Sequence, residues 1–215
     1  MKIFNNYAKL YAMNSNSLIS FASSVLKREA EAVLETMNFS INSCFVKAIE
    51  IIQDTCGKVI LTGIGKSGII AKKASATLSS TGTPSFFIHP SEASHGDLGG
   101  ITENDTVIAL SVSGNTKELT DIIFYSKYNN VNLIGITCNK DSVLCKNSVT
   151  SIILPKLSEA DENEIAPSST STAMLAICDA IAFTIAKSKS FSKKDFLKFH
   201  PGGSLGNQLK TELEK

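Results

Sequence analysis

The sequence predicts an α/β fold, a three-layer αβα sandwich built on a five-stranded parallel sheet with helices ahead of it. Five short runs rich in β-branched and aromatic residues lie at 59–64, 85–88, 106–111, 132–137 and 149–154. Segments with helical spacing separate these runs. Near-continuous apolar strands that alternate with helices are typical of a parallel sheet covered on both faces. Five such strands fit the flavodoxin-like order 2-1-3-4-5.

Helices are expected before the first strand and between the strands. Residues 17–37 and 41–54 carry apolar side chains at helical spacing, which predicts two N-terminal helices. The same spacing recurs in four later segments, at 67–80, 116–129, 171–187 and 194–199. No repeat or Pro/Gly-rich linker divides the chain. We therefore expect a single domain over residues 1–215, with a helical extension over about residues 1–56.

Composition narrows the class of protein. Of 215 residues, 43% are apolar, and 21 Lys and Arg balance 20 Asp and Glu to a net charge of +1. A nucleic-acid-binding protein would show a basic excess, and a disordered chain would be less apolar and more highly charged. The sequence has no run of about 18 apolar residues and no signal-peptide pattern. We expect neither a nucleic-acid nor a membrane partner.

The cysteines point to a reducing compartment. None of the five forms a C-x-x-C pair, so neither a zinc site nor a disulfide framework is indicated. We expect reduced core thiols of a cytoplasmic protein. They are Cys44, Cys56, Cys138, Cys145 and Cys178.

A glycine-rich turn follows the first strand. Its sequence from Thr62 to Gly68, TGIGKSG, matches G-x-G-x-x-G. A dinucleotide site would need an acidic residue at the end of the second strand, which instead ends in His89-Pro90, and a P-loop would need glycine where Ile60 stands. The turn is therefore expected to offer backbone N–H groups and Lys66 to an anion or to polar oxygens. A tight turn with a solvated lysine is the alternative.

Hydroxyl residues cluster after the third strand. Ser111, Ser113 and Thr116 alternate around Gly114, just before a predicted helix. Hydroxyl groups together with the N–H groups of a helix N-terminus form a cradle for a phosphate ester. Ordinary helix capping is the alternative, but one cap needs only Thr116. The pattern favours a phosphate cradle.

Three further loops carry polar residues. His89 and His95 bracket the loop after the second strand, where a structural or hydroxyl-binding role is favoured over a metal site because no other ligand cluster is visible. Four carboxylates within residues 159–164 are most simply a solvated loop. His200 precedes Pro-Gly-Gly, which predicts a rigid bend around a residue suited to acid–base chemistry.

Four segments together resemble the sugar isomerase (SIS) domain and, within it, the D-arabinose-5-phosphate isomerases. The resemblance covers about residues 18–209. The segments are Gly63–Gly68, Ser79–Pro90 (SSTGTPSFFIHP), Glu92–Gly99 (EASHGDLG) and His200–Gly203 (HPGG).

The resemblance implies a set of site residues. The catalytic positions would be Lys66, Glu118, Glu159 and His200. The substrate-binding positions would be Gly65, Ser67, His89, His95, Ser111, Ser113 and Thr116. It implies neither a cofactor nor a required metal, and zinc at His95 is expected to inhibit.

The resemblance also implies an assembly and a minimal size. Family members form homotetramers, in which His200 would reach a neighbour's site. Many continue beyond the His-Pro-Gly-Gly segment into CBS regulatory modules. Only residues 204–215 follow that segment here, too few for one such module.

Two departures from the family pattern stand out. Residues 161–164 read Asp-Glu-Asn-Glu where the family commonly has Cys-Pro-Leu-Gly, and Asn115 stands where glutamate is common. The first change adds negative charge near an anionic substrate. We expect it to affect loop conformation and affinity more than the reaction.

The implied reaction interconverts D-ribulose 5-phosphate and D-arabinose 5-phosphate through an enediolate, for Kdo (3-deoxy-D-manno-octulosonate) biosynthesis in lipopolysaccharide or capsule. Glu159 or His200 would act as the base, with the other assisting ring opening. Lys66 would stabilise the enediolate, and Glu118 would orient Lys66 or a hydroxyl. Two alternatives stay open: an isomerase of another sugar phosphate, and a non-catalytic SIS module that senses a sugar phosphate.

Overall fold

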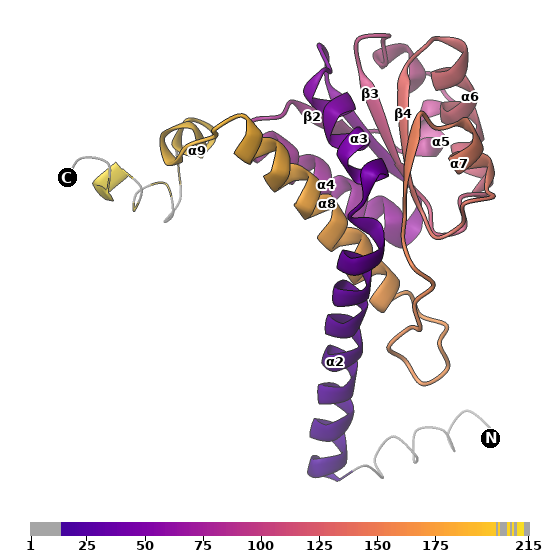
Figure 1. The fold of residues 1–215 in the computed structure, drawn as a ribbon, viewed down its shortest axis with the longest axis vertical. Coiled ribbons are helices and arrows are strands. Elements are labelled where there is room, and N and C mark those ends of the chain that lie inside the picture. The colour runs from indigo at the N-terminus through magenta and orange to yellow at the C-terminus, as the bar shows by residue number, and fades with distance from the viewer. Residues whose placement is uncertain (1–13, 201, 203–205, 207, 209, 213–215) are drawn as a thin grey trace.

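The computed structural model describes residues 14–200, 202, 206, 208 and 210–212. Its core is a sheet with all neighbouring strands parallel, in the order β2-β1-β3-β4-β5 (Figure 1). The predicted strand order and sheet type are therefore confirmed. The strands are β1 (Val59–Gly63), β2 (Ser85–Phe87), β3 (Thr106–Leu110), β4 (Asn132–Thr137) and β5 (Thr150–Ile153).

Helices cover both faces of the sheet, which gives the three predicted layers. Alternate strand residues point to opposite faces, so that Leu61 and Ile108 face one core while Ile60 and Val107 face the other. The first core is covered by α3 (Ser43–Gln53), α4 (Gly65–Ser80) and α8 (Ser169–Ser188), with α2 (Ser15–Ser40) packed on α8. The second is covered by α5 (Pro90–Ala93), α6 (Thr120–Tyr128) and α7 (Val143–Asn147).

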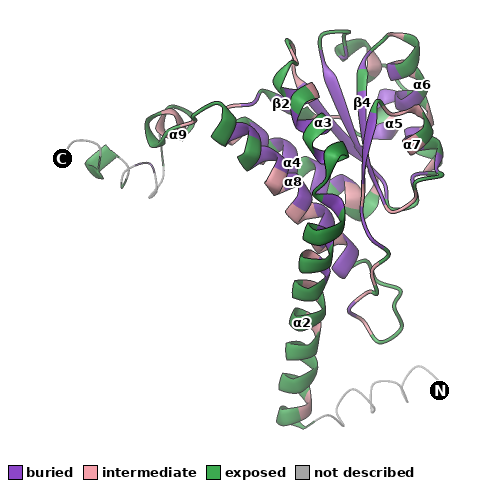
Figure 2. Cartoon of the chain, viewed as in Figure 1, coloured by how far each residue is buried: buried purple, intermediate pink, exposed green. Residues whose placement is uncertain are grey.

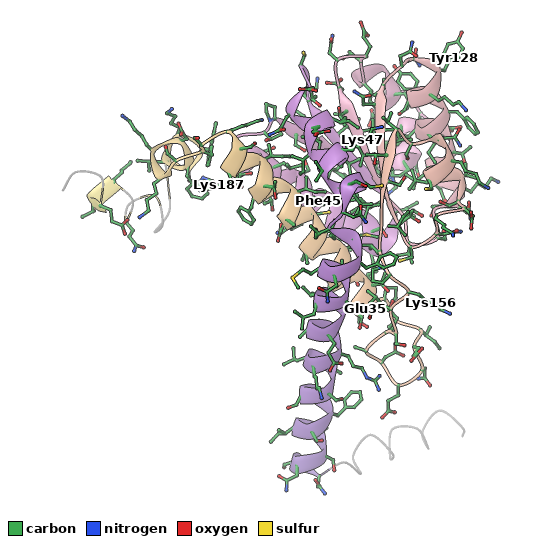
Figure 3. The ribbon with its side chains drawn as sticks, in the orientation of Figure 1. Glu35, Phe45, Lys47, Tyr128, Lys156 and Lys187 are labelled. Carbon is green, nitrogen blue, oxygen red and sulfur yellow. The ribbon has the colours of Figure 1, made fainter. Side chains whose placement is uncertain are left out.

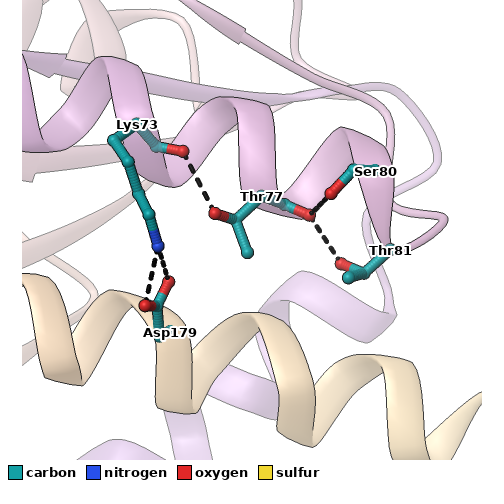
Figure 4. Close-up of polar contacts among 5 residues, drawn as sticks. All are labelled: Lys73, Thr77, Ser80, Thr81 and Asp179. Atoms are coloured by element: carbon teal, nitrogen blue, oxygen red, sulfur yellow. Dashed lines mark hydrogen bonds and ion pairs between the residues drawn. The ribbon is translucent and has the colours of Figure 1, made fainter. Parts of the chain in front are cut away.

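An ion pair joins the two long helices of the first layer. Lys73 Nζ of α4 lies 2.7 Å from Asp179 Oδ2 of α8 (Figure 4). One helical turn further along α4, the Thr77 carbonyl accepts hydrogen bonds from the hydroxyls of Ser80 and Thr81, which close the end of the helix. This end of α4 precedes the turn into β2. The ion pair to α8 and the hydrogen bonds at the helix end therefore hold α4 in place between β1 and β2.

Several predicted boundaries were wrong. The helix expected over residues 116–129 begins as a 3₁₀ turn, η2 (Lys117–Leu119), before α6. The short helices α5 and α7 and the 3₁₀ turn η1 (Asp97–Gly100) were not predicted, because four or five residues show no helical periodicity.

The N-terminal part and the cysteines also differ from expectation. Helix α3 is not an extension, because its buried residues belong to the first core: Phe45, Ala48, Ile49 and Ile52. Of the cysteines, only Cys178 is buried, whereas Cys44 and Cys56 are exposed. The expectation of five core thiols was therefore wrong, because it depended on residue type and not on which side of an element each cysteine occupies.

Helix α8 is long and apolar enough to cross a membrane by length and composition, with a mean hydropathy of 1.5. In this fold it packs against α2, α3 and α4, and Ile177, Ile181 and Ile185 are at most 3% exposed. Its composition is that of a core helix.

A buried carboxylate joins two loops at the amino end of the sheet, and its removal should destabilise the fold. Asp105 accepts hydrogen bonds from Lys58 N (2.6 Å), Thr102 N (2.8 Å) and Thr102 Oγ1 (3.0 Å). Burial acts to raise the pKa of Asp105, but these bonds outweigh it and hold the pKa below its ordinary value of 3.8. We expect Asp105→Ala to lower the free energy of unfolding by about 2–3 kcal/mol in urea at pH 7.

The pH dependence has a definite sign. A carboxyl whose folded-state pKa is lowered stabilises the protein above its ordinary pKa, and this stability is lost as pH falls through the folded-state value. The difference between parent and Asp105→Ala should therefore shrink below about pH 4. The exposed Asp141, replaced by alanine, is the control. An equal effect of the two variants would contradict the prediction.

Candidate active site

Three loops meet at the carboxyl edge of the sheet. They follow β1, β3 and β5, and parallel strands place these ends on the same edge. Gly63 at the end of β1 pairs with Leu110 at the end of β3, so the first two loops are neighbours. The point between them is also where the strand order reverses, which is the usual ligand position in such sheets.

The turn from β1 into α4 needs glycine because two backbones approach closely. A Cβ added at Gly68 would lie 2.5 Å from the Gly63 carbonyl oxygen. The N-cap residue Ile64 supplies no side-chain hydrogen bond to the helix. Lys66 is exposed and Ser67 half-buried on this first turn. The free N–H groups and the lysine leave the turn suited to an anion.

The hydroxyl loop after β3 is held by its own side chains. Ser111 is buried. Its Oγ lies 2.8 Å from Thr116 Oγ1 and accepts a hydrogen bond from Gly114 N at 3.0 Å. Gly114 has a φ of 65°, and a Cβ there would collide with the side chain of Ser142. Thr116 precedes η2 but makes no side-chain cap. Helix capping therefore does not account for these hydroxyls.

Asn115 replaces the glutamate common in the family and has a structural role here. Its Oδ1 accepts from Val143 N at 2.9 Å, the first residue of α7. Asn139 Nδ2 donates to the Ser113 carbonyl at 3.3 Å. The Asn115 amide thus fixes the outer side of the hydroxyl loop to α7.

Glu159, in the loop after β5, occupies the N-terminus of α8. Its carboxylate accepts from Ser168 N (2.7 Å), Ser168 Oγ (3.1 Å), Thr170 N (3.3 Å) and the Thr170 hydroxyl. Burial acts to raise the pKa of Glu159, but these hydrogen bonds outweigh it and hold the pKa below its ordinary value. The carboxylate is therefore ionised at neutral pH.

A run of hydroxyl residues, 168–172, begins α8. Such a run at a helix start is typical of caps and small packing residues, but the hydroxyls of Ser168 and Thr170 bind Glu159. The only signal in the sequence was that the run closely follows the acidic segment.

The negative charge of Glu159 acts on the segment that follows β4. Burial and, after it, the charge of Glu159 raise the pKa of the Cys138 thiol to about 11. Cys138 N donates to the Val112 carbonyl at 3.0 Å, between Ser111 and Ser113. Glu159 and the phosphate cradle predicted from the sequence thus both follow strands that end on the same edge of the sheet.

The acidic loop is only partly solvated. Asp161 Oδ1 accepts from Ile165 N and Ala166 N, both at 3.0 Å. Slight desolvation acts to raise the pKa of Asp161, but the backbone N–H groups outweigh it and hold the pKa below its ordinary value. Glu162 and Glu164 are exposed, as expected. Asp161 thus shapes the loop that carries Glu159.

The other predicted positions lie around the same edge. Glu118 is exposed in η2, two residues after Thr116, and His95 is exposed before η1. His89 Nδ1 accepts from Ser91 N at 3.3 Å, which caps α5. Beside it lies a pocket of about 250 Å³ lined by Gly63, Gly65, Gly68, Ile69, Lys72, Phe87 and His89.

Lys72 was not singled out in the sequence because it belongs to no motif, and Phe87 was quoted within Ser79–Pro90 without a role of its own. Within the part of the chain that the structure describes, no group of three or more His, Cys, Asp and Glu side chains could hold a metal. Zinc at His95 stays a prediction.

His200 lies at the opposite end of the sheet from the three loops. Helix α8 begins beside Glu159 and ends near Lys189, whose Nζ donates to Thr83 Oγ1 just before β2. Helix α9 (Lys193–Phe199) then leads away from the sheet (Figure 1). The His200 ring stacks on Phe196, with centroids 3.8 Å apart. The structure does not bring His200 to Lys66, and Pro201 and Gly203 of the expected bend lie outside the described residues.

Comparison with known proteins matches this architecture. Residues 53–184 match the SIS domain. The chain is 44% identical over 92% of its length to an uncharacterized protein of Rickettsia prowazekii, and 43% identical over 94% to arabinose 5-phosphate isomerase KdsD of Francisella tularensis. It covers 61% and 62% of these relatives, so it spans about three fifths of their length.

A solved structure extends the match. An Escherichia coli CFT073 protein in complex with arabinose 5-phosphate has a TM-score of 0.84 and 41% identity, and the match covers 88% of this chain and 100% of that one. The fold defines an α/β protein with a candidate ligand site between β1 and β3. The chain belongs to the SIS domain family.

The hydrogen bonds to Glu159 can be tested one at a time. Thr170→Val removes one donor, so the pKa of Glu159 should rise toward its ordinary value. A ¹³C NMR titration of the glutamate side-chain carboxyls measures it. Thr172→Val is the matched control, because Thr172 lies further along the same helix and its Oγ1 donates to Glu29 Oε2 instead. The prediction is wrong if both variants titrate like the parent.

Proposed function

We propose that this protein interconverts D-ribulose 5-phosphate and D-arabinose 5-phosphate. The observation that carries the proposal is the convergence of the Lys66 turn, the hydroxyl loop and an ionised Glu159 at one edge of the sheet. The match to a protein solved with arabinose 5-phosphate, over that protein's entire chain, supports the substrate. The product would serve Kdo biosynthesis, and we place the reaction in the cytoplasm.

The phosphate of the substrate would lie on Ser111, Ser113 and Thr116, near the N-terminus of η2. Ser111 and Thr116 already bond to each other, so little ordering remains on binding. Gly65 and Ser67, with His89 and His95, would bind the sugar hydroxyls. No cofactor is needed for a proton transfer between adjacent carbons.

Glu159 would be the base. It removes the C1 proton of ribulose 5-phosphate and returns a proton to C2 of the enediolate, while the O1 proton passes to O2, which leaves the aldehyde at C1. A carboxylate with a lowered pKa is a weak base, so stabilisation of the developing oxyanion must supply much of the rate. Lys66 is the cation placed for that role, and Glu118 would orient it.

His200 would act from a neighbouring subunit, in a homotetramer. Its own chain carries it to the far end of the sheet, so one chain holds an incomplete set of the four catalytic residues. We assign to it the opening and closing of the arabinose ring.

Solvent exchange separates these roles. Ribulose 5-phosphate is open-chain, because its O5 carries the phosphate and cannot close a ring. In D₂O, His200→Ala should therefore still lose the C1 proton signal by NMR, whereas Glu159→Gln should not. Exchange retained in Glu159→Gln and lost in His200→Ala would reverse the two assignments, and no turnover by the parent would refute the isomerase function.

Mixed subunits test whether His200 acts in trans. With arabinose 5-phosphate as the substrate, whose ring must first be opened, Lys66→Ala and His200→Ala should each be inactive, but mixing them after mild dissociation should restore about a quarter of the parent activity, as random pairing predicts. If Lys66 and His200 acted within one chain, every mixed site would lack one of them. No restoration in confirmed mixed oligomers would contradict the assignment.

A further inference from the structure

Helix α2 extends well beyond the body of the domain. It runs from Ser15 to Ser40, but its buried residues are only Ala32, Thr36 and Ser40. The part from residue 15 to residue 31 is exposed along nearly its entire length (Figure 2). We refer to residues 15–31 as the arm. An isolated helical arm of this length is marginal in water, so packing must stabilise it.

One side of α2 is apolar along its entire length. Its residues recur every three or four positions, which places them on one helical face. Ile19 is 66% exposed and Leu26 69% on the arm, and Met37 is 54% exposed nearer the body. We call this set the apolar seam: Ile19, Ala22, Leu26, Ala30, Val33, Met37 and Ile41.

The opposite side of α2 already has neighbours. Arg28, Glu31 and Glu35 line a polar pocket of about 390 Å³ with Lys156 and Glu164 of the acidic loop. Figure 3 shows Glu35 and Lys156 where the loop after β5 passes the helix. The acidic loop therefore faces the charged side of α2, whereas the outer part of the seam, from Ile19 to Ala30, is exposed.

The seam leads into an apolar groove on the body. Val33, Met37 and Ile41 from its inner end form a pocket of about 210 Å³ with Ala176, Ile177 and Ala180 of α8. Thr36 also lines the groove, and its hydroxyl finds no hydrogen-bond partner. The arm of one chain and the groove of another copy could therefore form the two sides of one contact.

We propose that a second copy of this chain covers the seam, through antiparallel pairing of α2 with α2 about a two-fold axis at Ala30. Within one residue, this register sets Ile19 opposite Ile41, Ala22 opposite Met37 and Leu26 opposite Val33. Apolar residues face apolar residues throughout, the small Ala30 lies at the axis where the helices come closest, and each arm lies on the other chain's groove. A two-fold contact of one surface with itself needs such self-complementarity.

The size of the seam suits a stable contact. It extends from Ile19 to Ile41, or about 33 Å at 1.5 Å per residue. A helix pair in contact over that length engages about six turns of each helix. The pairing specifies one contact surface of the oligomer in the proposed function. It rests on the proposed function only in that an oligomer exists.

Mass measurement by sedimentation tests the surface. Leu26→Glu on the arm and Met37→Glu at the groove should each reduce the mass of the parent oligomer by half. Phe39→Glu is the matched control, because Phe39 is as exposed as Met37, at 54%, but lies on the opposite side of the helix. An unchanged mass in Leu26→Glu, or a monomeric parent, would overturn the proposal. A seam covered by residues 1–13 of its own chain would give one of these two results.

Cross-linking tests the register. With Cys44 and Cys56 changed to Ser, Ala30→Cys should form a disulfide-linked dimer on oxidation, while Ile19→Cys alone should not. Ile19→Cys mixed with Ile41→Cys should cross-link. Self-cross-linking of Ile19→Cys would overturn the antiparallel register. Neither measurement uses substrate, so failure here leaves the isomerase function intact, and an inactive parent leaves the pairing intact.

Discussion

The parallel pairing of β1 with β3 is the constraint on which the site depends. Because Gly63 and Leu110 are in register, the anion-binding turn and the hydroxyl loop begin at the same level of the sheet. Gly68 packs its backbone directly on Gly63, and Gly114 packs on Ser142, so neither loop can move away without opening the core. A site built from loops is rigid here because close packing at these two glycines holds its two main parts.

The second constraint is electrostatic. The N-terminus of α8 has no cap from Ser168, and Glu159 supplies the missing acceptor from outside the helix. A negative charge at a helix N-terminus is favourable, so the interaction that stabilises α8 also keeps Glu159 ionised and oriented. The stability of α8 and the proposed chemistry therefore depend on the same carboxylate, that of Glu159. Asp161 shapes the loop that carries it, although Glu162 and Glu164 in that loop are exposed.

A single chain leaves two needs unmet. His200 lies at the amino end of the sheet, away from Lys66 and Glu159, and the apolar seam of α2 lies in solvent. Both follow from the direction in which long helices leave the domain. α8 carries the chain across the sheet and α2 extends past it, and in the assembly proposed above both would meet a second chain.

The sequence by itself determined the layers, the positions of the strands and the three loops that carry polar residues, whereas the strand order was only one that five such strands fit and was settled by the structure. These follow from local periodicity and from the rule that parallel strands end on one edge. The short helices α5 and α7 escaped it, because one turn has no period. Only the tertiary structure decided that Ser168 and Thr170 bind Glu159, that Asn115 secures α7 and that Cys44 and Cys56 are exposed. Those outcomes depend on which residues distant in sequence meet, and no local pattern contains that information.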